Sequence, residues 1–134
     1  MYSKIIVGLS LDHGISETAI GVARKLADDG AEIIAVHVYE QPNSSVRAYM
    51  DDELLEGAQQ NAKARLEERV KDEEGVKAVL LNGHSGRAIT DYAKKAGADC
   101  IVVGSHKPDL SDFLLGSTAA RVVRHASCAV HVLR

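Results

Sequence analysis

The sequence has no excess of positive charge and no long apolar run. Its 134 residues include 16 lysines and arginines against 19 aspartates and glutamates, so the formal net charge is -3. Without a basic excess or a basic block, nothing attracts the chain to nucleic acid or to anionic lipid. No apolar run approaches the roughly 20 residues that a membrane span needs. We therefore expect neither nucleic acid nor a membrane as a partner.

Cysteine is also scarce. Cys100 and Cys128 have no motif spacing, and Cys100 lies inside an apolar run, which predicts a buried thiol in a reducing compartment. Residues 1–4 lead directly into a strand pattern, without the charged start and long apolar stretch of a signal peptide. We therefore expect a cytoplasmic protein, with a single domain spanning residues 1–134 because the chain is too short for two cores.

Enzyme signatures are missing as well. The sequence contains no G-x-G-x-x-G, no G-x-x-x-x-G-K-[ST] and no G-x-S-x-G segment. No nucleophile is paired with a base, and the six histidines lack metal-ligand spacing. The sequence therefore favours binding over turnover, with a nucleotide hydrolase or a phosphotransfer protein as the enzymatic alternative.

A strict alternation of strand and helix patterns runs along the whole chain. Apolar, β-branched runs predict strands at 4–10, 31–38, 76–81, 98–103 and 129–133. Amphipathic periodicity predicts helices at 15–29, 51–73, 87–96 and 118–125. The alternation predicts an α/β fold, a doubly wound five-stranded parallel sheet with helices on both faces. In the common strand order the first and fourth strands are neighbours, and ligands bind beyond their carboxyl ends.

The details at the ends of these elements give further expectations. Gly30 is expected to cap the end of the first helix, and Gly75 to end the second. The second helix should bury one stripe of apolar side chains, namely Leu54, Leu55, Ala58, Ala62, Leu66 and Val70. Residues 39–50 form the one long loop, which either closes over a ligand or serves a partner.

The segment after the fourth strand is the most informative. Gly104 ends that strand, a polar loop follows, and Gly116-Ser117-Thr118 opens the last helix. A Gly-Ser-Thr turn at a helix start presents backbone N–H groups and hydroxyls to an anion, most often a phosphate. Ser117 and Thr118 are also good helix N-caps, so capping alone is the competing interpretation.

Other side chains are predicted at the same edge of the sheet. Lys107 is the one cation inside the loop and His106 lies beside it, so they are charge and hydrogen-bond partners for a phosphate, or else solvated loop residues. Ser10 and Asp12 follow the first strand, where Asp12 either holds ribose or Mg²⁺ or begins a turn. His37 within the second strand is interpreted as a satisfied core histidine rather than a ligand.

Over essentially its whole length the chain resembles a small single-domain universal stress protein. That family's loop reads Gly-x2-Gly-x9-Gly-Ser/Thr, where Gly104 matches the first glycine and Gly116-Ser117 match the end. His37-Val38 matches the family's His-Val at the end of the second strand, and 123–134 is similar to its last helix and strand. The loop wording, Ser-His-Lys-Pro-Asp followed by Leu-Leu-Gly-Ser, resembles a bacterial F/G-type subgroup.

The resemblance implies an adenine nucleotide alpha hydrolase-like, Rossmann-like fold that binds ATP, with or without Mg²⁺, at the carboxyl ends of strands one and four. It implies at most slow ATP hydrolysis, a stress-response or nucleotide-sensing role, and a homodimer formed through Ala129 to Leu133, with Val38 contacting adenine through its backbone. The nucleotide-binding residues expected on this basis are Ser10, Asp12, Val38, Val103, Gly104, His106, Lys107, Gly116, Ser117 and Thr118.

The loop also departs from the family pattern. Lys107 stands where the second glycine is expected, and the loop is one residue shorter. These departures favour the alternative of a dimeric interaction protein of the same fold that binds no nucleotide. Retention of Gly116-Ser117 counts against that alternative.

Overall fold

The computed structural model describes residues 1–11, 16–105 and 115–134. Its five strands form one parallel sheet in the order β3-β2-β1-β4-β5. Their bounds are β1 Tyr2–Gly8, β2 Ala27–Tyr39, β3 Val76–Asn82, β4 Cys100–Gly104 and β5 Ala129–Leu133. The α/β fold with a five-stranded parallel sheet is confirmed, and so is the predicted pairing of the first and fourth strands.

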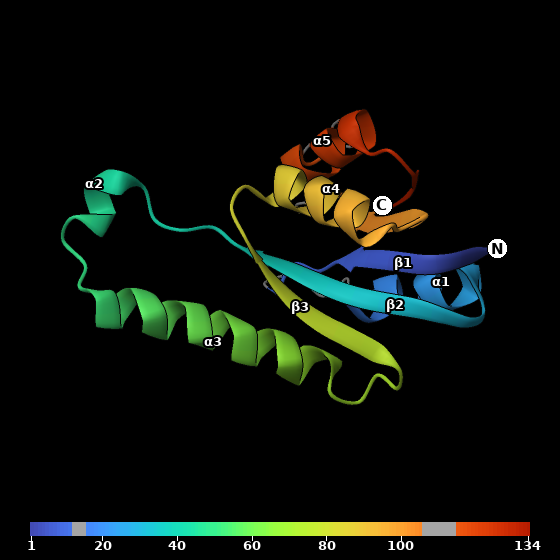
Figure 1. The fold of residues 1–134 in the computed structure, drawn as a ribbon, viewed down its shortest axis with the longest axis horizontal. Helices are drawn as coiled ribbons and strands as arrows, with labels where there is room; N and C mark the ends of the chain where they lie inside the picture. The colour runs from blue at the N-terminus through green and yellow to red at the C-terminus, as the bar shows by residue number, and fades with distance from the viewer. Residues whose placement is uncertain (12–15, 106–114) are drawn as a thin grey trace.

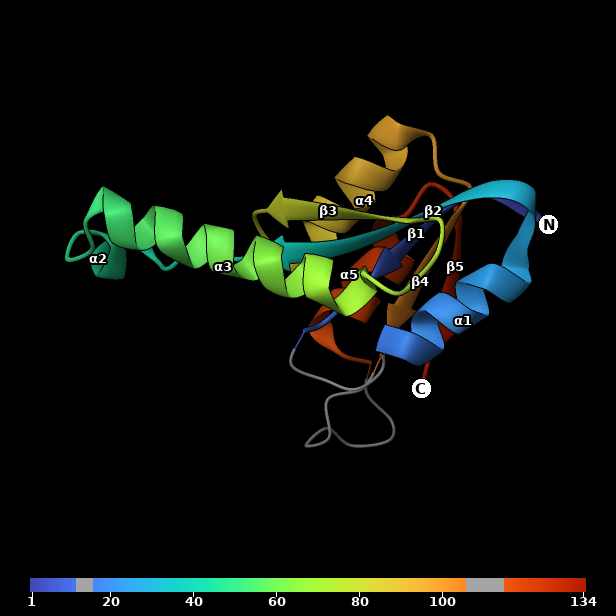
Figure 2. The same ribbon diagram turned by 90° about the horizontal axis from the view of Figure 1, so that it is seen from below.

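Helices cover both faces of this sheet. Their bounds are α1 Ser16–Leu26, α2 Ser44–Arg47, α3 Asp52–Val70, α4 Ser85–Ala96 and α5 Ser117–His125. The buried side chains of α1 and α3 share a core cluster on one face, and those of α4 and α5 share a cluster on the other (Figure 1, Figure 2). In the part of the chain that the structure describes, no helix has the length and apolarity that crossing a membrane requires.

The central strands explain why the sequence shows continuous apolar runs there. In β1, Ile5 and Val7 face α1 and α3, whereas Ile6 faces α4 and α5, and all three side chains are fully buried. The neighbouring strand β4 alternates in the same way, with Cys100 on the first face and Ile101 on the second. A strand covered on both faces needs apolar residues at every position. The thiol of Cys100 is buried, as expected, and desolvation raises its pKa to about 11.

The start of β2 corrects the expectation for residues 27–30. The helix ends at Leu26, and Ala27 already pairs with Tyr2 of β1, so Gly30 does not cap a helix. Between the pairs Tyr2–Ala27 and Lys4–Glu32 the register shifts, and Gly30 has a φ of 78°, which suits a bulge in the strand. Pairing with the distant amino terminus therefore ended the helix earlier than its own residues predicted.

The second predicted helix buries less of its length than expected. Ala62, Leu66 and Val70 are buried, but Leu54 is 58% exposed, so the predicted stripe is wrong at its amino-terminal end. Figure 1 shows α2 and the first half of α3 projecting away from the sheet. The buried residues of α3 all lie in its second half, and apolar periodicity buries a side chain only where a surface covers it. The predicted loop 39–50 contains α2.

Asp99 fixes the beginning of β1 from the turn before β4. Its Oδ2 accepts from the backbone N and the Oγ of Ser3 at 2.9 and 3.0 Å, and its Oδ1 accepts from the backbone N of Lys4 at 3.0 Å. Desolvation alone raises the pKa of Asp99, but the hydrogen bonds from Ser3 and Lys4 outweigh it and hold the pKa below its ordinary value. The carboxylate is therefore a better partner for β1 than the neutral acid.

We expect Asp99→Asn to lower the free energy of unfolding at pH 7 by roughly 1 kcal/mol, because hydrogen bonds to a charged acceptor become hydrogen bonds to an amide. The folded pKa is depressed, so this contribution is present above the unfolded pKa of about 3.9 and is lost as the pH falls through the folded value. Urea unfolding of both proteins at pH 7 and pH 3 measures the difference. Asp29→Asn, at an exposed position, is the control, and a difference that persists unchanged at pH 3 would contradict the assignment.

Candidate functional site

The carboxyl ends of β1, β2 and β4 meet at one edge of the sheet. The register pairs Gly8 with Val36 and Val7 with Val102, so residues two or three further along, Ser10, Val38 and Ser105, lie level with one another. Strand order reverses between β1 and β4 at this edge, which is where doubly wound folds bind their ligands. Three of the predicted site residues, Ser10, Val38 and Gly104, therefore lie at the same edge of the sheet.

Two backbone hydrogen bonds hold the connection between β4 and α5 at its two ends. Ser105 is only 4% exposed, and its N donates to the carbonyl of Leu133 at 2.7 Å. The carbonyl of Ser105 accepts from the N of Gly116 at 2.8 Å. The amino end of α5 is therefore held next to the carboxyl end of β4, where Gly104 closes the strand as predicted.

The structure gives a packing reason for a glycine at position 116. A Cβ added at Gly116 would lie 3.1 Å from the carbonyl oxygen of Ser105, a tighter approach than a normal contact. Gly116, and not Ser117 or Thr118, is the N-cap of α5, so the competing interpretation that Ser117 or Thr118 serves as the N-cap is wrong. Packing against Ser105 is enough to explain the glycine. A larger residue at position 116 would disturb this packing, so a loss of ligand binding in such a variant could result from a changed fold.

The amino terminus of α5 differs from those of the other long helices whose starts are described. In α3, Asp51 Oδ1 accepts from the N of Leu54 at 2.8 Å. In α4, Glu40 Oε1 accepts from the N and the Oγ of Ser85 at 3.0 and 2.8 Å. The N-cap of α5, Gly116, has no side chain, no other side chain among the described residues caps this helix, and its first turn contains no acidic residue. The N–H groups there keep the partial positive charge of a helix amino terminus, which suits an anion.

The exposure of the predicted site residues differs along this edge. Ser117 is exposed and Thr118 half-buried, so both hydroxyls lie near the surface at the start of α5. Val38 and Val103 are 8% and 2% exposed and belong to the core under α4 and α5, so their side chains are not available to a ligand. The predicted site residues Asp12, His106 and Lys107 lie outside the described residues.

The exit of β1 from the sheet is fixed by β2. The N of Leu9 donates to the carbonyl of Val36 at 2.8 Å, and Nδ1 of His37 lies 2.9 Å from the carbonyl oxygen of Leu9, to which it donates. His37 is thus a satisfied histidine within the fold, as interpreted from the sequence. Ser10 follows and is exposed.

Two arginines reach the same exit of β1 from α3. Arg69 Nη2 donates to the carbonyl of Leu11 at 3.0 Å, and Arg65 Nη2 donates to it at 3.4 Å. Sequence reasoning missed both residues. The only available signal was their spacing of four in a helix, which places two side chains on one face but does not say what they contact.

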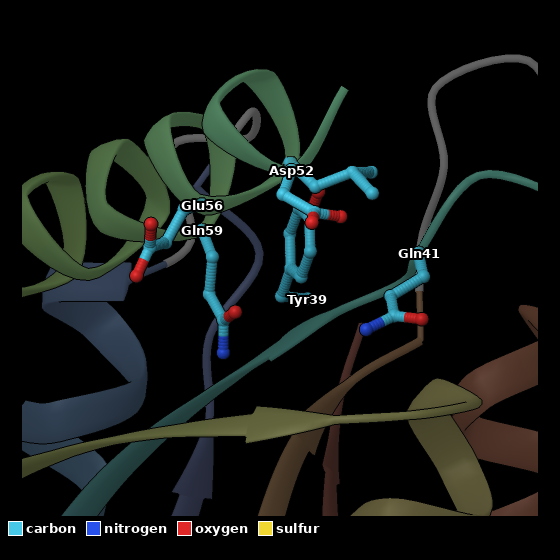
Figure 3. A pocket seen from close by; sticks show the side chains of 6 residues that line it. Tyr39, Gln41, Asp52, Glu56 and Gln59 are labelled. Atoms are coloured by element: carbon cyan, nitrogen blue, oxygen red, sulfur yellow. The ribbon is translucent and has the colours of Figure 1, made fainter. Parts of the chain in front are cut away.

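A separate cavity of about 320 Å³ opens between α3 and the end of β2. Figure 3 shows Asp52, Glu56 and Gln59 of α3 opposite Tyr39 and Gln41, and Leu55 completes the lining. Two carboxylates make this cavity unfavourable for a phosphate, so the start of α5 is the better candidate for an anion site. Within residues 1–11, 16–105 and 115–134, no three histidine, cysteine, aspartate or glutamate side chains group as metal ligands.

A model of the universal stress protein family matches residues 1–134. Universal stress protein G of Shigella flexneri is 32% identical to the chain over 142 residues, which cover 100% of both proteins.

Solved structures share the fold. The hypothetical protein MJ0577 has a TM-score of 0.82 and 27% identity, over 99% of this chain and 96% of its own. A universal stress protein in complex with cAMP has a TM-score of 0.72 over 99% of this chain and 97% of its own. The Archaeoglobus fulgidus protein in complex with dAMP has a TM-score of 0.66 over 99% of this chain and 98% of its own. Both complexes are 21% identical to this chain and show a common fold.

Proposed function

The chain belongs to the universal stress protein family, and from that premise we propose that it binds an adenine nucleotide, ATP in the first instance, at the carboxyl ends of β1 and β4. The observation that carries the proposal is the amino terminus of α5, which no side chain among the described residues caps and which is held beside the end of β4. Such a terminus stabilises a phosphate through backbone N–H groups and the helix dipole. Relatives of this fold in complex with cAMP and dAMP support an adenine ring and a phosphate as the recognised groups.

Within this proposal each end of the nucleotide has its own contacts. The phosphates lie at the N–H groups and hydroxyls of Ser117 and Thr118, beside Gly104 and Gly116, and adenine lies against the backbone of Val38 and Val103. Ser10 contributes from the end of β1. Asp12, His106 and Lys107 complete the proposed set. Because the described residues offer no grouped metal ligands, Mg²⁺ would enter together with the phosphates that coordinate it.

We extend the proposal to a cytoplasmic homodimer that responds to stress by sensing nucleotide, with at most slow hydrolysis. The strand β5 lies at the edge of the sheet, where its free backbone groups suit pairing with a second copy of Ala129 to Leu133. Two-fold pairing of this kind gives an isologous interface. Light scattering after size exclusion tests the dimer, and a monomer at every concentration tested would remove it.

Thermal unfolding of the protein with ATP, ADP, AMP and GTP, each with and without Mg²⁺, tests the nucleotide proposal. A ligand at a hundredfold excess over its Kd stabilises the folded state by about 2.7 kcal/mol. We therefore expect the Tm to rise by on the order of 5–10 °C with adenine nucleotides. An equal rise with GTP would leave phosphate binding and contradict adenine recognition. No rise with any nucleotide at millimolar concentration would contradict the proposed function.

A further inference from the structure

The carbonyl oxygen of Leu11 accepts from two guanidinium groups that lie one helical turn apart in α3. The contact from Arg69 is 3.0 Å and that from Arg65 is 3.4 Å. A carbonyl oxygen has two lone pairs and can accept both donors. Two charged donors at one peptide group form a stronger link than a neutral hydrogen bond.

Apolar packing supports the same link. The side chain of Leu11 is 4% exposed and belongs to the core cluster that contains Leu66 and Val70. These two residues follow Arg65 and Arg69 directly in α3, so the buried stripe of the helix and its two arginines meet the same residue of the chain. The second half of α3 thus holds both the side chain and the carbonyl of Leu11.

The link at Leu11 matters because Ser10 lies between two residues, Leu9 and Leu11, whose backbone groups are both held by hydrogen bonds. The N and the carbonyl of Leu9 are both bonded to β2, through Val36 and His37. Two residues later, the carbonyl of Leu11 is bonded to α3. Ser10 lies between them and is exposed at the edge where β1 and β4 end. The direction of the Ser10 peptide is therefore set from β2 on one side and from α3 on the other.

We propose that Arg65 and Arg69 are positioning residues of the nucleotide site, which hold the end of β1 so that Ser10 faces the ligand. This inference rests on the proposed function for its effect on affinity. The arginines act through the backbone of Leu11 and not through a phosphate.

The experiment compares Arg65→Ala, Arg69→Ala and the double variant with the natural protein. Titration calorimetry measures the Kd of AMP, ADP and ATP, and urea unfolding confirms that each variant folds. We expect the double variant to bind each of the three nucleotides about 10-fold more weakly, and the three factors to agree within about 2-fold. Arg69→Lys should weaken binding less than Arg69→Ala does, because lysine keeps a charged donor. A loss that grows from AMP to ATP would assign the arginines to the phosphates and overturn the positioning role.

Arg24→Ala is the matched control. Arg24 Nη2 also donates to a backbone carbonyl, that of Glu74 at 2.8 Å, and pairs with Glu73 at 3.1 Å, but it does so just before the amino end of β3. We expect Arg24→Ala to lower the free energy of unfolding while leaving each Kd unchanged. A similar loss of affinity in Arg24→Ala would show that general loosening weakens binding, and would overturn the specific role of Arg65 and Arg69.

An arm without nucleotide separates this inference from the proposed function. The ¹H–¹⁵N spectrum of the ligand-free double variant should show the amide signals of Ser10 and Leu11 displaced, and Arg24→Ala should leave them in place. If the natural protein binds no nucleotide, the proposed function fails and this comparison still decides whether the arginines position Ser10. Unmoved Ser10 and Leu11 signals in the double variant would overturn the inference.

Discussion

Gly86→Ala is expected to lower the free energy of unfolding, although alanine is the better helix former. Gly86 is buried in the first turn of α4, where a Cβ would lie 2.7 Å from Cβ of Arg121 in α5 and 2.9 Å from its Cγ and Cδ. A contact of 2.7 Å to a Cβ forces the two helices apart, because that atom moves only with its backbone. Overpacking costs about 1–3 kcal/mol and outweighs the gain of about 1 kcal/mol in helix propensity. Gly86→Val adds further atoms to the contact and is expected to cost about 3 kcal/mol or more.

Gly57→Ala provides the control with the opposite sign. Gly57 is exposed in α3, and a Cβ added there meets nothing within 4 Å. The same chemical change is therefore expected to stabilise the protein by about 0.5–1 kcal/mol through helix propensity alone. Urea unfolding of Gly86→Ala, Gly86→Val and Gly57→Ala under one set of conditions measures all three. If Gly86→Ala stabilises the protein as Gly57→Ala does, the close α4–α5 contact does not exist in solution.

The sheet could be predicted from the sequence because the local apolar pattern locates each strand and the rules of sheet topology limit how the strands are arranged. Each strand shows an apolar run of its own, and the strict alternation with helices leaves few parallel arrangements once crossovers are right-handed. The predicted bounds of the last strand, 129–133, agree with β5, and β3 extends one residue further than expected. The anion site at the start of α5 stays a prediction, and it was drawn from residues that are adjacent in the chain, Gly116-Ser117-Thr118.

The parts that the sequence did not predict depend on partners far away in the chain. The bulge at Gly30 follows from the pairing of Ala27 with Tyr2, and α4 begins two residues early, at Ser85, where Glu40 accepts from its backbone N. The close approach of Gly116 to Ser105 is likewise visible only in three dimensions. In each case the residue type was informative, but the atom that it contacts could not be read from neighbours in sequence.

Ser117→Glu is expected to stabilise the folded protein and to weaken nucleotide binding at the same time. Ser117 is the first residue of α5 after the N-cap Gly116, and its side chain is exposed. A carboxylate in the first turn of a helix interacts favourably with the helix dipole and adds about 0.3–1 kcal/mol to stability. The same carboxylate competes with a phosphate for the N–H groups and repels it. We expect the Kd for ATP to rise at least 10-fold, which is about 1.4 kcal/mol.

Ser117→Glu is expected to raise stability while it lowers nucleotide affinity, so a loss of binding cannot be attributed to a damaged fold. It is therefore a sharper test than a bulky residue at Gly116. Ser127→Glu has the same net charge but lies exposed beyond the carboxyl end of α5, so its Kd should match that of the natural protein. Ser117→Gln adds nearly the same volume without charge and should weaken binding far less than Ser117→Glu. Calorimetric titration with ATP and AMP, together with urea unfolding, measures both quantities. An unchanged Kd in Ser117→Glu would place the phosphates away from α5 and remove the observation on which the proposed function rests.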